Sequence, residues 1–131
     1  HRSLSIRQVI STVNKLSQYN FILVGRYRDI SNNVKVHNLP KNIFYLPKQD
    51  AGFMTTLALI KLADIIITPD TSIAHAANAF NKPTIAIYGN DKVNMKIWGP
   101  LSDKCLVLTT DKDFNKYNFK EIIKGVYAVL K

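Results

Sequence analysis

The sequence lacks several features that would assign it to a specialised class of protein. It has a single cysteine, Cys105, which excludes an internal disulfide and favours a reducing compartment. No apolar run approaches the roughly 20 residues that a membrane-spanning helix needs, and the first residues lack the apolar core and cleavage site of a signal peptide. An initiator methionine is also absent, so we expect a fragment of a longer protein. A chain of 131 residues predicts one domain with its own core.

Acidic residues are half as common as basic ones. The chain has 9 Asp and Glu against 18 Lys and Arg, which gives a formal net charge of +9. A positive field favours anionic partners such as nucleotides, phosphorylated glycans, anionic lipid surfaces or nucleic acid, and the charge alone does not choose between them. The basic residues are scattered along the chain, so a solvated lysine-rich surface explains any one of them equally well.

Apolar segments of two kinds alternate along the chain, as is typical of α/β proteins. Short continuous apolar runs at 21–25, 43–46, 64–68, 84–88 and 106–109 predict strands that are covered on both faces. Segments with apolar residues at helical spacing predict helices over 6–18, 53–63, 72–80 and from about 118. We therefore expect a three-layer, Rossmann-like parallel sheet, formed as a single domain over residues 1–131.

Some segments carry their own expectations. Residues 26–42 are polar and predict a short strand at 34–36 with little room for a crossover helix, and residues 90–104 are typical of a loop. The helix over 53–63 is apolar on nearly all sides, which predicts a buried helix. Cys105 is expected to be a small hydrophobic residue that starts a strand.

Ligands of parallel sheets bind at the carboxyl ends of the strands, so the loops after Val24, Leu46 and Thr68 are the candidate positions of a ligand site.

The unit over residues 63–89 carries the strongest candidate site. Its turn places Asp70, Thr71 and Ser72 at the start of a helix, where backbone N–H groups and the helix dipole favour an anion. Helical periodicity puts His75 on the same side as Thr71 and Ser72. We predict that this side binds a phosphate or pyrophosphate, and that Asp70 caps the helix, accepts from ligand hydroxyls or orients a neighbour. The other side is predicted to be buried: Ile73, Ala76, Ala77 and Phe80.

Other site chemistries fit the sequence less well. Asp70, Ser72 and His75 are crowded onto one helical turn, whereas a hydrolase triad draws its members from separate loops. His1, His37 and His75 are far apart in sequence and no cysteine cluster accompanies them, so no metal site is expected. Glycine-rich phosphate-binding loops and single-strand nucleic-acid motifs are also missing, so we expect no nucleic-acid partner.

The segment from Leu62 to Gly89 resembles the heptosyltransferase family, glycosyltransferase family 9. That family has an apolar strand, then Asp-Ser/Thr-Gly-x-x-His-x-Ala-x-Ala, then Pro-Thr and a strand that ends near Phe-Gly. The matching residues here are Asp70-Thr71-Ser72-Ile73-Ala74-His75-Ala76-Ala77-Asn78-Ala79, then Pro83-Thr84 and Tyr88-Gly89. The resemblance is specific over 70–89 and looser over most of the rest. Ser72 stands where the family usually has glycine, and the family's basic phosphate-binding segment would lie at or before His1.

The resemblance implies the C-terminal, nucleotide-sugar-binding half of a two-domain GT-B glycosyltransferase. The donor would be ADP-heptose or another nucleotide sugar, with no metal, and the acceptor a phosphorylated lipopolysaccharide or lipooligosaccharide core. The catalytic base would come from an N-terminal acceptor domain, so these 131 residues alone are expected to be inactive. Carried over position by position, the donor-binding residues would be Asp70, Thr71, Ser72 and His75 at the diphosphate and sugar, and Pro47 and Lys48 beside the base and ribose.

The resemblance also implies a cytoplasmic location, with peripheral association at the inner face of the inner membrane as a further option. The alternative interpretation is a non-catalytic nucleotide- or anion-binding module with the same fold. Ser72 in place of glycine and the missing domain are the arguments for that alternative.

Overall fold

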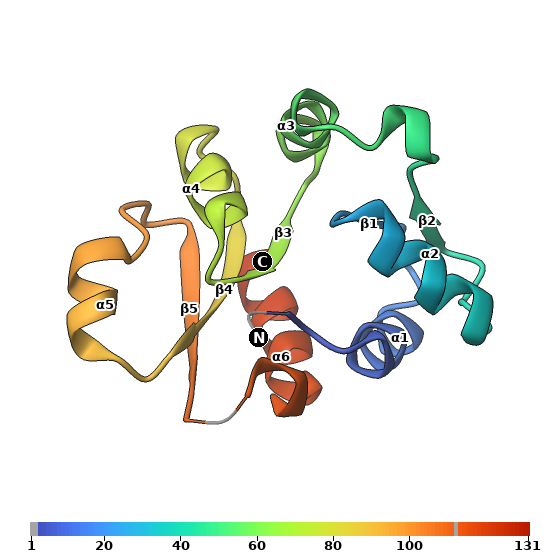
Figure 1. The fold of residues 1–131 in the computed structure, drawn as a ribbon. Coiled ribbons are helices and arrows are strands. Elements are labelled where there is room, and N and C mark those ends of the chain that lie inside the picture. Colours follow the sequence, from blue (N-terminus) through green and yellow to red (C-terminus); the bar gives the residue numbers. More distant parts are fainter. Residues whose placement is uncertain (1–2, 112) are drawn as a thin grey trace.

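The computed structural model describes residues 3–111 and 113–131, so His1 lies outside the described residues. Helices lie on both sides of the strands (Figure 1). In chain order the elements are α1 (Ile6–Lys15), β1 (Phe21–Leu23), α2 (Tyr27–Val36), β2 (Ile43–Tyr45), η1 (Lys48–Asp50), α3 (Phe53–Leu62), β3 (Ile66–Pro69), α4 (Ser72–Ala79), β4 (Thr84–Gly89), α5 (Lys92–Trp98), β5 (Cys105–Thr110), η2 (Phe114–Lys116) and α6 (Phe119–Val129).

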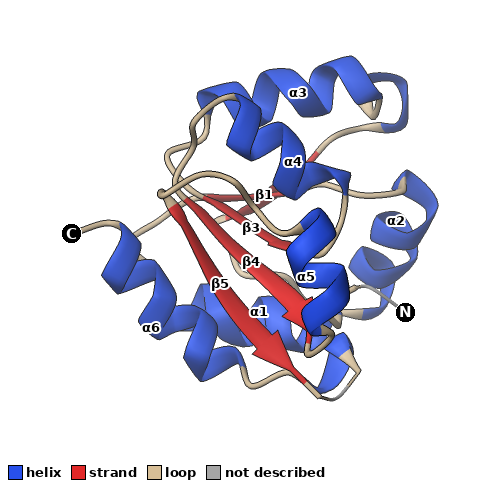
Figure 2. Cartoon of the chain, turned by 90° about the vertical axis from the view of Figure 1, so that its left-hand side faces the viewer, coloured by secondary structure: helices blue, strands red, loops and turns tan. Residues whose placement is uncertain are grey.

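The strands form two parallel ladders. β1 pairs with β2, and β3, β4 and β5 form the larger ladder in that order. α1 and α6 lie side by side on one face of the larger ladder, and α4 and α5 lie on the other face (Figure 2). This arrangement confirms the predicted α/β class with parallel strands and helices on both faces.

The alternation of side chains along β4 builds a core layer on each face, because successive residues of a strand point in opposite directions. Ile85 is fully buried with Leu16 and Val126 between the strands and the α1–α6 pair. On the opposite face, Tyr88 is fully buried with Ala74 of α4. Partly buried residues of β1 and of the β3 region pack against the first cluster and join the two ladders: Phe21, Ile65 and Ile67.

Residues 27–36 form the helix α2, so the prediction of a short strand without a crossover helix was wrong. Tyr27, Ile30 and Val34 have helical spacing and are half-buried, but polar residues around them weaken the pattern. Asp29 stabilises the first turn, since Arg26 Nε lies 2.8 Å from its Oδ2. The helix supplies the crossover that two parallel strands require.

Residues 92–98 form a second helix that the sequence did not predict, α5, inside the expected loop. Asp91 is its N-cap, with Oδ1 accepting from the backbone N–H groups of Val93 and Asn94 at 3.0 and 3.1 Å. The helix ends at Gly99, where a Cβ would clash with the carbonyl oxygen of Met95. These local contacts set both ends of a helix that is too short to show clear periodicity.

α3 is largely exposed, so the prediction of a buried helix was wrong. Ile60 is buried, whereas Phe53, Met54 and Leu62 are 68%, 75% and 78% exposed. Within the described residues α3 packs mainly against one other helix, α4. An apolar composition on all sides of a helix therefore did not correspond to burial on all sides.

The buried side of α4 differs in part from the prediction. Ala77 is fully buried as expected, but its buried companion is Ala74, and Phe80 is 38% exposed. Ala74 packs against Ala86 and Tyr88 of β4, where small side chains let the helix approach the strands closely. The buried side of α4 therefore lies closer to Ala74 than the helical spacing predicted. The other predicted elements are present, with ends that differ by at most three residues.

Candidate functional site

The candidate site is the turn that joins β3 to α4 at the carboxyl edge of the larger ladder. The backbone N–H of Asp70 donates to the carbonyl of Ile87 at 2.8 Å, so the chain leaves the ladder only after Asp70. Thr71 is the N-cap of α4, and its Oγ1 accepts from the backbone N–H of Ile73 at 3.3 Å. The Thr71 hydroxyl also lies 3.0 Å from Thr68 Oγ1 on β3. The strand thus holds the cap residue at the start of the helix.

Asp70 contacts a neighbouring helix, and the N-cap position of α4 belongs to Thr71. The side chain of Asp70 is buried, and its Oδ2 accepts a hydrogen bond from Asn94 Nδ2 of α5 at 3.2 Å. This contact agrees with the orientation of a neighbour, one of the three roles that the sequence allowed, and acceptance from ligand hydroxyls stays a prediction. The contact holds α5 beside the start of α4.

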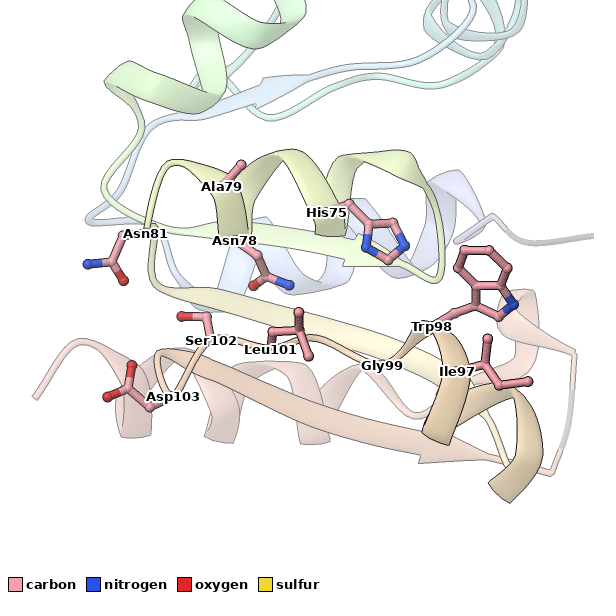
Figure 3. A pocket seen from close by; sticks show the side chains of 10 residues that line it. All are labelled: His75, Asn78, Ala79, Asn81, Ile97, Trp98, Gly99, Leu101, Ser102 and Asp103. Atoms are coloured by element: carbon pink, nitrogen blue, oxygen red, sulfur yellow. The ribbon is translucent and has the colours of Figure 1, made fainter.

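A hollow of about 310 Å³ lies at this helix start. It brings together four of the six residues predicted to bind the donor: Asp70, Thr71, Ser72 and His75, with Asn94 and Trp98 of α5 completing the wall. Ser72 and His75 are exposed, so a ligand in the hollow can reach both side chains. Figure 3 shows the His75 ring projecting from α4 toward the end of α5 that carries Trp98.

Pro47 and Lys48 do not line this hollow. They follow β2, where Pro47 is the N-cap of η1 and Lys48 is its first residue. Their position after a strand of the smaller ladder agrees with the predicted loop, and their contact with a base or ribose stays a prediction.

Ser72 has an ordinary backbone conformation. Among the described non-glycine residues, Asn81 is the one with a positive φ, 52°. The left-handed conformation that would make serine strained in place of glycine is therefore not required at position 72. Asn81 instead ends α4 in a Schellman motif, with Lys82 N–H donating to the Ala77 carbonyl at 2.9 Å.

Asn94 and Trp98 are the site residues that sequence reasoning missed. Both lie in the segment that was expected to be a loop. The available signal was Asp91, an N-cap residue type placed just before a short run with Val93 and Ile97 at i and i+4. That signal is weak, because the local sequence contributes little to this helix. Contacts with β4 and with the turn before α4 hold α5 in place.

The single cysteine lies away from the hollow. Cys105 begins β5 and packs against the cluster of Ala74, Ala86 and Tyr88, which confirms its predicted hydrophobic role. Burial raises the pKa of the Cys105 thiol, and a backbone hydrogen bond involving Ala86 partly opposes this rise.

Over the described ranges, 3–111 and 113–131, no group of three or more His, Cys, Asp or Glu side chains is arranged to hold a metal ion. The same ranges contain no helix with the length and apolar character of a membrane span.

Comparisons with known proteins point to one family. The model of glycosyltransferase family 9 (heptosyltransferase) matches residues 31–125. A curated relative from Escherichia coli (strain K12), named "Putative lipopolysaccharide heptosyltransferase 4", is 31% identical over 85 residues, which cover 59% of this chain and 24% of the relative.

Two solved structures share the fold. E. coli ADP-heptose lps heptosyltransferase II superposes with a TM-score of 0.79 at 19% identity. The family 9 glycosyltransferase from Veillonella parvula DSM 2008 superposes with a TM-score of 0.73 at 15% identity. Each match covers 98% of this chain and 42% of the solved chain. The chain therefore spans less than half the length of these relatives.

Proposed function

This chain belongs to glycosyltransferase family 9, the heptosyltransferase family, and on that premise we propose that it is a donor-binding domain which holds the diphosphate of a nucleotide sugar at the start of α4. The observation that carries the proposal is the convergence of Thr71, Ser72 and His75 on one hollow. Two hydroxyls, an imidazole and the positive end of a helix dipole are suited to an anion.

Asp70 bears on this proposal because its carboxylate lines the same hollow. A carboxylate pointing freely into the hollow would repel a diphosphate. The hydrogen bond from Asn94 instead engages one oxygen of Asp70 and holds the side chain toward α5. The carboxylate then serves the site by placing α5, whose Trp98 forms part of the wall.

The proposed reaction is the in-line displacement of the nucleoside diphosphate by an acceptor hydroxyl. Negative charge develops on the leaving diphosphate, and donors that are already in place at the helix start stabilise that charge. Ser72 and His75 supply this stabilisation within the chain, and Thr71 holds the start of the helix through its contacts with Thr68 and Ile73. The base that removes the proton from the acceptor would come from an N-terminal acceptor domain of the same enzyme.

The identity of donor and acceptor is also a proposal. The name of one solved relative includes ADP-heptose, and the name of the curated relative includes lipopolysaccharide. We propose ADP-heptose or a related nucleotide sugar as donor and a phosphorylated lipopolysaccharide or lipooligosaccharide core as acceptor, without a metal cofactor. The net charge of +9 suits such an acceptor, and suits a cytoplasmic enzyme that works at the inner face of the inner membrane.

Titration calorimetry with a panel of nucleotides tests the donor site. We expect the chain to bind one of ADP, UDP and GDP selectively, and to bind the matching monophosphate more weakly, because the helix start recognises the second phosphate. CMP serves as the comparison for a donor that carries one phosphate. Absence of binding at millimolar concentrations of every nucleotide would favour the alternative, a module that kept the fold and lost the donor site.

A further inference from the structure

Helix α5 has an inner and an outer side of different chemistry. The inner side is held by the rest of the domain, since Met95 packs against the buried cluster of α4 and β4 and Asn94 donates to Asp70. The outer side carries Val93 and Ile97, one helical turn apart and both exposed. Among the described elements, none covers this outer side (Figure 2). It is therefore open to a partner.

Two more apolar side chains extend the exposed surface beyond the helix. Trp98 is the last residue of α5, and Leu101 follows it with 99% of its surface exposed. The hydroxyl of Tyr88 donates to the carbonyl of Trp98 at 3.3 Å, so the backbone at this point is tied to β4. Figure 3 shows Ile97 and Trp98 together at the end of α5.

These four side chains, which we call the α5 patch, form a cluster: Val93, Ile97, Trp98 and Leu101. Single exposed apolar residues are common on protein surfaces and need no explanation. Four large ones within nine consecutive residues are a feature of surfaces that contact another molecule or a membrane.

Lysines surround the α5 patch. Lys92 and Lys96 lie on α5 and Lys104 lies just before β5, and all three are exposed. No acidic residue occurs from position 92 to 102. Of the two acids that flank this segment, Asp91 is engaged as the N-cap of α5, and Asp103 is next to Lys104. The surface around the patch is therefore cationic.

A mixture of apolar and cationic side chains fits the surface of an anionic lipid bilayer. Apolar side chains enter the boundary between head groups and acyl chains, while the ammonium groups of lysines stay in contact with lipid phosphates. A tryptophan suits this boundary because its large ring is apolar and its N–H is polar.

Helix α3 also exposes apolar residues, but it lacks this combination. Lys61 is the one basic residue of α3, and the helix has no tryptophan. The charge and the aromatic residue thus distinguish α5 from α3. Because Lys61 and Leu62 are consecutive and exposed, as Lys96 and Ile97 are, α3 provides matched controls for α5.

We propose that the α5 patch docks on the surface of an anionic phospholipid bilayer. Asn94 and Trp98 of the same helix form part of the wall of the donor hollow, so docking would hold that hollow beside the lipid surface. The inference rests on the proposed function for this purpose, because an acceptor carried on a lipid would then meet the donor there. Docking itself requires no nucleotide.

Trp98 is the one tryptophan of the chain, so its fluorescence reports directly on the patch. The probes are phosphatidylcholine vesicles with and without phosphatidylglycerol, in the absence of nucleotide. We expect the anionic vesicles to move Trp98 emission to shorter wavelength, and brominated acyl chains in them to quench it. The neutral vesicles should have a weaker effect, and added salt should weaken binding to the anionic ones.

Variants of α5 and α3 make the experiment specific, with vesicle cosedimentation as the measurement. We expect Ile97→Ser to weaken binding to anionic vesicles by about tenfold, through the loss of one inserted aliphatic side chain. Lys96→Gln should weaken it by about fivefold, the effect of one lysine near an anionic surface. Leu62→Ser and Lys61→Gln should bind as the unmodified chain does.

Four results would overturn the inference. The first is an absence of binding to anionic vesicles, and the second is an equal loss of binding from the α5 and α3 variants. The third is self-association in sedimentation velocity that Ile97→Ser abolishes, which would assign the patch to a second copy of the chain. The fourth is vesicle binding of the full-length enzyme that Ile97→Ser leaves intact, which would mean that another part of the enzyme covers the patch.

The donor site is tested separately by the nucleotide calorimetry described above. Binding of ADP by a chain that does not bind vesicles would contradict the docking surface and leave the proposed donor site intact. Binding to vesicles by a chain that binds no nucleotide would contradict the proposed function and leave the docking surface intact.

Discussion

Replacing His75 by alanine is expected to lower the turnover of the full-length enzyme by about 100-fold, the usual effect of removing one donor from a developing negative charge. His75 lines the hollow with Thr71 and Ser72 and is exposed toward it. The loss should appear mainly in kcat, because charge on the leaving diphosphate grows in the transition state. Steady-state transfer kinetics with a nucleotide-sugar donor measure the effect.

Two further variants make the His75 experiment specific. His75→Gln retains an N–H donor and should keep more activity than His75→Ala. His37→Ala removes an imidazole at the end of α2, away from the hollow, and should leave turnover unchanged. Transfer kinetics of His75→Ala equal to those of the unmodified enzyme would remove His75 from the proposed mechanism.

Leu16→Ala is expected to destabilise the chain by about 2–5 kcal/mol, the range measured for cavities left by buried leucines. Leu16 has no exposed surface and packs with Ile85 and Val126 in the cluster that joins the two strand ladders. A cavity there weakens contacts of α1, β4 and α6 at once. Urea unfolding followed by circular dichroism measures the difference in the free energy of unfolding.

Leu62→Ala is the matched control for the core experiment. Leu62 ends α3 and is 78% exposed, so the same substitution should change the free energy of unfolding by about 0.5 kcal/mol or less. The pair also tests the finding that α3 is largely exposed. Equal losses from the two variants would contradict the distribution of buried residues described above.

The turn before α4 could be predicted from the sequence because its determinants are local. Thr71 caps the helix that begins one residue later, and the spacing of Ser72 and His75 along the helix places them on one side. The alternation of apolar segments was sufficient to predict the fold class, because each segment can also be recognised from its local sequence. Each of these signals lies within a few consecutive residues.

The rest of the site depends on contacts between distant segments. Asn94 reaches the site through its hydrogen bond to Asp70, and Trp98 is held by the hydroxyl of Tyr88. Neither contact leaves a periodic pattern in residues 90–104. The buried side of α4 was misjudged for a related reason, since its contact with Ala86 on β4 decides which alanine faces inward.

The most direct test of the account is amide NMR of the ¹⁵N-labelled chain with ADP, adenosine and inorganic pyrophosphate. If the start of α4 holds the diphosphate, ADP and pyrophosphate should shift the amide signals of residues 71–75, and adenosine should not. Shifts confined to other segments, such as η1 or the lysine-bearing α6, or an absence of shifts at millimolar concentration, would contradict the assignment of the donor site to Thr71, Ser72 and His75.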